Sequence, residues 1–353
     1  MTPIRFRTHP AAVVVGLLLM ISVSGCAREP QESRYRFTAM GTLVEVTIFD
    51  FPAQAAAEAA REIESLFIDL QHEWDPWEDG SLGQLNAAAQ RGAPITPDAD
   101  LADLLDRASR ISVATGGVFD PAVGRLIKLW GFNNAEALPG RPPSADKVQQ
   151  ALESTVPLAR LWDRHTGTLA ATSGTTIDLG AFAKGEAVDR AITLLRSRGV
   201  ENAIVNAGGD LRAIGRHGER PWKIGVREPR GPGILAAIQV SGDETVFTSG
   251  DYERFFEYEG HRYHHVLDPR TGFPSRGLIS VTVMGSEAAK TDAACTALMV
   301  AGPDHWPAVA RALGVTRVMA VREDGVIEMS PEMRDRVTLL REDEPVVELL
   351  EVQ

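Results

Sequence analysis

The chain has 353 residues, with 36 lysines and arginines against 48 aspartates and glutamates, and a formal net charge of −12. No basic patch with interleaved aromatic residues interrupts this acidic composition, so nucleic acid is not expected as a partner. The length beyond an N-terminal leader is enough for one large domain or two closely packed domains.

The first residues have the pattern of a secretory signal. Arg5 and Arg7 precede an apolar run from Ala11 to Val23, about a dozen residues long, whereas a membrane-spanning helix needs roughly 20. Small residues and then Cys26 follow, which resembles a bacterial lipobox and implies cleavage before Cys26 and acylation of that residue. We expect a lipid anchor in a bacterial membrane, facing the periplasm or the cell exterior. The alternative is a plain signal peptide followed by an accidental cysteine.

Cys26 and Cys295 are the two cysteines of the sequence. If Cys26 is acylated, no disulfide can form within the chain, and Cys295 is expected to be a buried lone thiol. The organisation that follows is a lipoprotein signal over residues 1–25, a polar tether over 26–34 and one folded domain over 35–353.

The mature chain opens with an alternating segment and then helical segments. Tyr35–Phe49 alternates as a strand or hairpin does, with a break at Met40–Thr42. Apolar spacing near 3.6 residues predicts helices over Pro52–Leu70 and Asp98–Thr115, and a short helix over Asp146–Glu153.

Short strands dominate the second half of the chain, with three helices among them. The predicted strands are Thr168–Asp178, Ala203–Val205, Leu211–Gly215, Lys223–Val226, Ile234–Val240, Glu244–Thr248, Phe255–Tyr258, Arg262–Leu267 and Leu278–Met284. The predicted helices are Phe182–Arg198, Glu287–Val300 and Asp304–Leu313. This pattern indicates an α+β fold with mixed, largely antiparallel sheets and flanking helices.

Two tryptophans and two glycine-rich turns carry ambiguous signals. Trp74 and Trp77 lie in the acidic segment Glu73–Ser81, where a binding surface and a packed loop are equally good interpretations. The turns Thr115–Pro121 and Asn206–Asp210 lack the Rossmann and P-loop spacings, so neither predicts a dinucleotide or Walker-type site.

Lys184 lies near the start of the predicted helix that follows Asp178. The positive end of a helix dipole disfavours a cation there but attracts anions, so the lysine becomes favourable if a phosphate binds. An ordinary surface lysine is the alternative.

Two adjacent histidines precede an Asp-Pro-Arg-Thr-Gly turn. The alternation of Arg262–Leu267 places His265 on the face of Leu267 and His264 on the other face. A histidine held beside a sharp turn suits proton transfer, and an ordinary structural role is the alternative for both.

Asp292 and Thr296 lie four residues apart on a predicted helix that Ser286 would cap, so they share a face. Carboxylate and hydroxyl oxygens suit Mg²⁺ or Ca²⁺ and do not suit zinc. A solvent-facing pair is the alternative.

These motifs occur together and in order. They are Met40–Thr42, Gly116–Pro121 with Leu129–Phe132, Ile177–Ala181 with Lys184–Gly185, Asn206–Asp210, Thr248–Tyr252, His265–Gly272, and Thr291–Ala293 with Thr296. The set resembles the FAD:protein FMN transferase family, the ApbE-type flavin transferase lipoproteins, from about Tyr35 to about Leu313. The resemblance implies an ApbE-like fold for residues 35–353.

The resemblance also implies a reaction and a set of roles. FAD and a Ser or Thr hydroxyl of an acceptor protein would give phosphoester-linked FMN and AMP, with Mg²⁺ required. His265 would be the catalytic base, and the metal would lie against Ala181, Asp292 and Thr296. The flavin nucleotide would contact Met40, Trp77, Val118, Phe119, Asp120, Asp178, Lys184 and Leu267.

The sequence departs from the family pattern in two places. The first loop reads Trp74–Ser81 where many members have a tyrosine followed by Pro-Asp-Ser, so the match of Trp77 is the loosest. Cys295 stands where some members have a second carboxylate, which puts a second metal ion and strong hydrolytic activity in doubt. An FAD pyrophosphatase and a non-catalytic flavin-binding lipoprotein are the alternative functions.

Overall fold

The computed structural model describes residues 31–92, 94–134, 137–341 and 346–352. The expected signal peptide and Cys26 lie outside these residues. The folded part begins with a strand at Glu32, so residues 32–34 of the expected tether belong to the fold. In the described part of the chain, no helix has both the length and the hydropathy that a membrane span requires.

The structure has helices and strands in mixed order. The helices are α1 (Ala53–Trp74), α2 (Ser81–Gln90), α3 (Ala99–Ala114), α4 (Gly124–Leu129), α5 (Ala145–Ser154), α6 (Leu158–Leu161), α7 (Ala183–Ser197), α8 (Ala288–Ala301), α9 (Trp306–Leu313) and α10 (Pro331–Arg334). The strands are β1 (Glu32–Ala39), β2 (Thr42–Phe49), β3 (Trp162–Asp163), β4 (Thr168–Leu169), β5 (Ala203–Ala207), β6 (Asp210–Ile214), β7 (Trp222–Arg227), β8 (Ile234–Val240), β9 (Glu244–Gly250), β10 (Phe255–Tyr258), β11 (His261–His264), β12 (Leu278–Gly285), β13 (Arg317–Arg322), β14 (Ile327–Met329), β15 (Val337–Leu339) and β16 (Val347–Leu349).

The largest sheet has nine strands within the described residues, in the order β1-β2-β5-β6-β9-β12-β13-β14-β16. Every neighbouring pair is antiparallel except β14 and β16. A smaller antiparallel sheet has the order β15-β8-β7. Short turns join the antiparallel pairs β1–β2, β5–β6, β7–β8, β10–β11 and β13–β14, and longer connections join the others. The predicted α+β class is confirmed.

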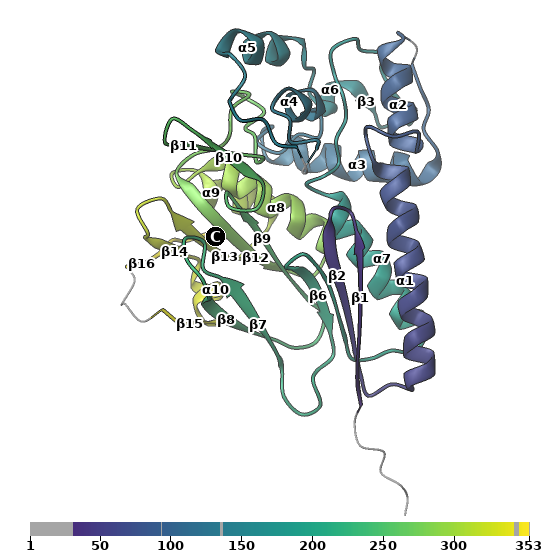
Figure 1. The fold of residues 1–353 in the computed structure, drawn as a ribbon, viewed down its shortest axis with the longest axis vertical. Helices are drawn as coiled ribbons and strands as arrows, with labels where there is room; N and C mark the ends of the chain where they lie inside the picture. Colours follow the sequence, from purple (N-terminus) through teal and green to yellow (C-terminus); the bar gives the residue numbers. More distant parts are fainter. Residues whose placement is uncertain (1–30, 93, 135–136, 342–345, 353) are drawn as a thin grey trace, which may run out of the picture. The chain divides into compact units, whose positions relative to one another are not determined.

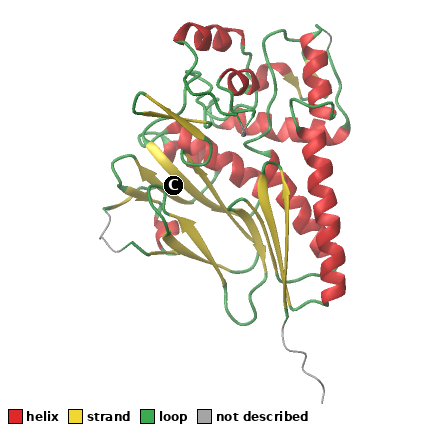
Figure 2. Cartoon of the chain, in the orientation of Figure 1, coloured by secondary structure: helices red, strands yellow, loops and turns green. Residues whose placement is uncertain are grey.

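The large sheet is covered on both faces. One face packs against α1, α7 and α8, and the other packs against the smaller sheet (Figures 1 and 2). Strand β9 shows the alternation directly, because Phe247 belongs to the helical core and Val246 to the core between the sheets. This double coverage explains why β12 is buried along almost its whole length.

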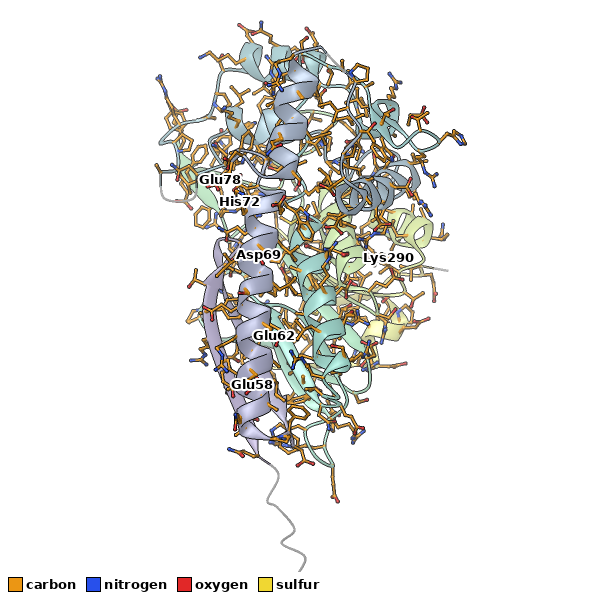
Figure 3. The ribbon with its side chains drawn as sticks, turned by 90° about the vertical axis from the view of Figure 1, so that its right-hand side faces the viewer. Glu58, Glu62, Asp69, His72, Glu78 and Lys290 are labelled. Atoms are coloured by element: carbon orange, nitrogen blue, oxygen red, sulfur yellow. The ribbon has the colours of Figure 1, made fainter. Side chains whose placement is uncertain are left out.

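Helix α1 is amphipathic. Its buried positions recur every three or four residues, at Ile63, Phe67, Leu70 and Trp74. Its outer face carries acidic residues such as Glu58, Glu62 and Asp69, and at its end His72 faces Glu78 (Figure 3). Trp74 is therefore the last residue of a packed helix, where it is buried and not part of an exposed loop.

A third apolar cluster links α4, α5 and the β10–β11 hairpin. Trp130 is buried at its centre and donates a hydrogen bond from Nε1 to the carbonyl of Gly272 at 2.8 Å. This contact attaches the Asp-Pro-Arg-Thr-Gly turn to the end of α4, 142 residues earlier in the chain.

Two local predictions are wrong. Thr168–Asp178 forms a strand only at Thr168–Leu169, and the remainder is irregular and rich in small polar residues. Ser286 does not cap α8. The carboxylate of Asp189, on α7, instead accepts hydrogen bonds from the backbone N–H groups of Ala288 and Ala289 at 2.9 and 3.1 Å.

Candidate active site

A cavity of about 570 Å³ opens where the β1–β2 turn, the starts of α4 and α7, the middle of α8 and the open end of the β10–β11 hairpin meet. All the residues that the sequence predicts for the site line it. They are Met40, Trp77, Val118, Phe119, Asp120, Asp178, Ala181, Lys184, His265, Leu267, Asp292 and Thr296. The fold thus gathers these residues from six separated segments around one space.

Asp292 and Thr296 lie on the face of α8 that lines the cavity. Asp292 is buried and its Oδ2 accepts a hydrogen bond from the N–H of Gly185 at 2.9 Å. Burial, together with Asp210, raises the pKa of Asp292 to about 7, although Lys184 opposes the shift. The solvent-facing alternative for this carboxylate is therefore wrong.

The donor chemistry around Asp292 fits a hard cation. Lys184 does not fully offset the unfavourable burial of the negative charge of Asp292, since the pKa of Asp292 is still raised. The hydroxyl of Thr296 and the main chain of Ala181 line the same cavity. Within the described residues no three His, Cys, Asp or Glu side chains form a metal cluster, so a cation here would need hydroxyl and carbonyl ligands as well. Those are the oxygen ligands that Mg²⁺ accepts.

Asp210 is a site residue that the sequence prediction missed. Its Oδ2 forms an ion pair with Lys184, and its Oδ1 accepts a hydrogen bond from the N–H of Thr248 at 2.8 Å. Burial opposes the charge of Lys184, but Asp210 and Asp292 together raise the pKa of the lysine, so it stays protonated. The glycine-rich turn before Asp210 was noted in the sequence. The ion pair was missed because Lys184 lies 26 residues from Asp210 in the chain.

Gly185 holds the two helices of the site close together. A Cβ at this position would lie 2.6 Å from the carbonyl carbon of Ala288 and 2.7 Å from the Cα of Ala289. Both are backbone atoms, which cannot move independently of α8.

We therefore expect Gly185→Ala to destabilise the protein by about 1–3 kcal/mol, because the clash outweighs the gain of roughly 1 kcal/mol in helix propensity. Thermal unfolding measures the change. The matched control is Gly140→Ala, since Gly140 has open space around it. An unchanged melting temperature for Gly185→Ala would contradict the close approach of the helices.

His265 lies directly after β11 and lines the cavity. Its Nδ1 is 3.3 Å from the carbonyl oxygen of Arg254, which also accepts the backbone N–H of His265 at 3.0 Å. A carbonyl oxygen only accepts, so the contact places the proton on Nδ1 and leaves Nε2 as the proton acceptor. Burial, and then the charge of Arg254, lower the pKa of His265 well below its usual value.

His264 is buried away from the cavity. Its Nε2 lies 3.0 Å from the carbonyl oxygen of Ser275, and burial lowers its pKa. The two histidines therefore face opposite sides, as the alternation predicts.

The depressed pKa of His265 predicts a pH dependence. A base acts in its neutral form, which is populated above its pKa, so activity should persist below pH 6.5 and fall only when His265 gains a proton. The measurement is kcat against pH at saturating Mg²⁺. An acid limb centred above pH 6.5 would contradict the assignment of His265 as an unprotonated group.

Two segments form the mouth of the cavity. Met40 has a φ of +50°, which is unfavourable for a residue other than glycine, and its N–H donates to Oε1 of Gln71 at 2.5 Å. Trp77 is half-buried, and the ammonium of Lys128 lies 5.5 Å from the centroid of its ring. Gln71 thus fixes the β1–β2 turn on α1, and both Trp77 and the buried Trp74 line the cavity.

The carboxylates of Asp120 and Asp178 both accept hydrogen bonds from other groups of the protein. Asp120 accepts hydrogen bonds from Ser112 Oγ and from the N–H groups of Ala122 and Leu158. Asp178 accepts the N–H of Gly180 at 2.7 Å. Burial raises the pKa of both. Asp120 therefore braces the glycine-rich loop, so that buried Val118 and Phe119 line the cavity.

The comparisons with known proteins agree with this arrangement. The model of the ApbE family matches residues 40–319, most of the chain and all of the cavity-lining segments. The chain belongs to the ApbE family.

Relatives in the family have named activities. An FAD:protein FMN transferase of Rhodobacter capsulatus is 36% identical over 94% of the chain, which spans 63% of that longer protein. The FAD:protein FMN transferase of Treponema pallidum is 34% identical, with 92% of this chain and 95% of the relative covered. The chain is thus a flavin transferase of the ApbE family.

Solved structures of ApbE proteins share the fold. The protein from Thermotoga maritima superposes with a TM-score of 0.78 at 35% identity, over 87% of this chain and 99% of that one. The flavin transferase ApbE from Vibrio cholerae gives 0.76 at 27% identity, with the same two coverages. The predicted ApbE-like fold is confirmed.

Cys295 is the position at which the sequence puts a second carboxylate in doubt. It is buried on α8, and its Sγ lies 3.2 Å from the carbonyl oxygen of Phe247. Burial raises the pKa of the thiol, so this position offers a protonated group and no second carboxylate.

Proposed function

We propose that the chain transfers FMN from FAD to a serine or threonine hydroxyl of an acceptor protein, releases AMP and depends on Mg²⁺. One observation carries the proposal: a single cavity brings together a histidine poised to accept a proton, an oxygen-ligand pair on α8 and a protonated lysine. The names of the relatives support the transfer of FMN to protein.

His265 is the proposed base of the reaction. The acceptor hydroxyl attacks the phosphorus of the FMN half, its proton moves to Nε2 of His265, and a new O–P bond forms as the P–O bond to AMP breaks. The carbonyl of Arg254 holds the ring in the tautomer that this step requires. AMP departs as a phosphate, a leaving group that needs no proton.

Ala181, Asp292 and Thr296 would hold Mg²⁺. A bound Mg²⁺ neutralises pyrophosphate charge and makes the phosphorus more open to attack. Lys184 adds a permanent positive charge at the start of α7, where a phosphate is also favoured by the helix dipole. In a chain of net charge −12, these positive contributions offset the general repulsion of an anionic substrate.

We further propose that Cys26 carries a lipid anchor that faces the protein to the periplasm or the cell exterior. The lipobox-like pattern that ends at Cys26 supports this proposal. Mass spectrometry of the mature amino terminus tests it, and an unmodified cysteine would refute it.

One assay separates the proposed transferase from the two alternatives. Protein lacking residues 1–26 is incubated with FAD, Mg²⁺ and a candidate acceptor, and the acceptor is then denatured. Flavin fluorescence on the acceptor band supports the transferase. Free FMN without labelled acceptor supports a pyrophosphatase, and unchanged FAD supports a flavin-binding protein.

A further inference from the structure

Arg254 is a cavity residue to which no sequence motif points. It lines the cavity directly before β10, opposite His265, because the hairpin pairs Phe255 with His264. Its charge contributes to the lowered pKa of His265, and it opposes the upward pKa shifts of Lys184 and Asp178. The guanidinium therefore lies within electrostatic range of three other cavity residues.

This arginine lacks the partner that other arginines of the chain have. Arg230 places two N–H groups on the carboxylate of Asp251, and Arg212 does the same on Asp243. Within the described residues, Arg254 has no carboxylate within 4.0 Å, and its side chain makes one long hydrogen bond, 3.4 Å to the carbonyl oxygen of Phe132.

The guanidinium of Arg254 is accessible from the cavity, because the residue lines it and is exposed. A guanidinium stays protonated in proteins, so its charge and its donors are available to an anion that enters the cavity. Its planar set of donors matches two oxygens of a phosphate.

We propose that Arg254 binds the phosphate of the FMN half of FAD through two N–H···O hydrogen bonds. The inference rests on the proposed function, in which FAD is the substrate. The FMN phosphate is chosen over the AMP phosphate because the main chain of Arg254 holds His265, and the base must lie beside the phosphorus that the hydroxyl attacks. One residue then aligns the base through its carbonyl and the phosphate through its side chain.

The test compares ligands that differ only in phosphate. Equilibrium binding of FAD, FMN and riboflavin is measured by flavin fluorescence for the parent protein, Arg254→Gln and Arg254→Lys. We expect Arg254→Gln to weaken FAD and FMN binding by about 10- to 100-fold and to leave riboflavin binding unchanged. Arg254→Lys should restore part of the loss, because it keeps the charge without the paired donors.

The matched control is Arg216→Gln, an exposed arginine on a distant loop, which should bind all three ligands normally. Equal losses for riboflavin and FAD in a folded Arg254→Gln protein would show that the residue only shapes the cavity, and would overturn the proposal. Unchanged FAD binding would also overturn it. The binding assay needs no acceptor, so a protein that binds FAD in this pattern but labels no acceptor refutes the proposed function and leaves the role of Arg254 standing.

Discussion

Replacing Asp292 with alanine is expected to reduce turnover by roughly a thousandfold or more and to abolish its dependence on Mg²⁺. The carboxylate is the one charged oxygen donor that α8 presents to the cavity beside Thr296. Acceptor labelling against Mg²⁺ concentration measures the effect. Full activity of the parent protein in EDTA would refute the metal site.

A stability measurement separates loss of the metal from loss of the fold. Burial raises the pKa of Asp292 to about 7, so its ionised form is unfavourable in the metal-free protein. Relief of this cost opposes the loss of the hydrogen bond from Gly185, so the variant should melt close to the metal-free parent. Added Mg²⁺ should raise the melting temperature of the parent but not that of the variant, because a ligand stabilises only a protein that binds it. The matched control is Asp304→Ala, an exposed aspartate outside the cavity.

Replacing His265 with alanine is expected to reduce transfer by about 10²- to 10⁴-fold, the usual contribution of a general base, while FAD binding persists. Single-turnover labelling gives the rate, and fluorescence titration gives the affinity for FAD. The low-pH limb of the rate profile should also disappear, because its titrating group is gone.

The same hairpin offers a matched control. His261 is exposed at the start of β11 and does not line the cavity, so His261→Ala should keep the parent rate. His264 is a poorer control, because it is buried and its removal would also cost stability. Transfer at the parent rate by His265→Ala would exclude histidine as the base.

The sequence predicted those elements whose signals are local. The strand limits of β8 and β10 match the prediction, and α1, α3 and α7 begin within one residue of it. Helix α3 shows why. Its capping residue Asp98, which accepts the N–H of Leu101, its apolar spacing and the glycines that end it all lie within one short stretch of sequence. The strands from β13 onward were not predicted, since they lie beyond the recognised motifs, which end near Leu313.

The failures concern partners that are distant in sequence. The cap of α8 comes from Asp189, 99 residues before Ala288, and no local pattern records it. Arg254 is different, because it could have been found. The turn at Glu259–Gly260 lies midway between the two predicted strands, and counting outward from it places Arg254 opposite His265.

The capping of α8 by Asp189 has a consequence for how the site loses structure. Asp189 caps the first turn of α8 only while α7 is folded beside it, which couples the unfolding of the two helices. Lys184 belongs to one of these helices and Asp292 to the other. This coupling favours opening of the two helices together, so the charges of the cavity are lost together as well.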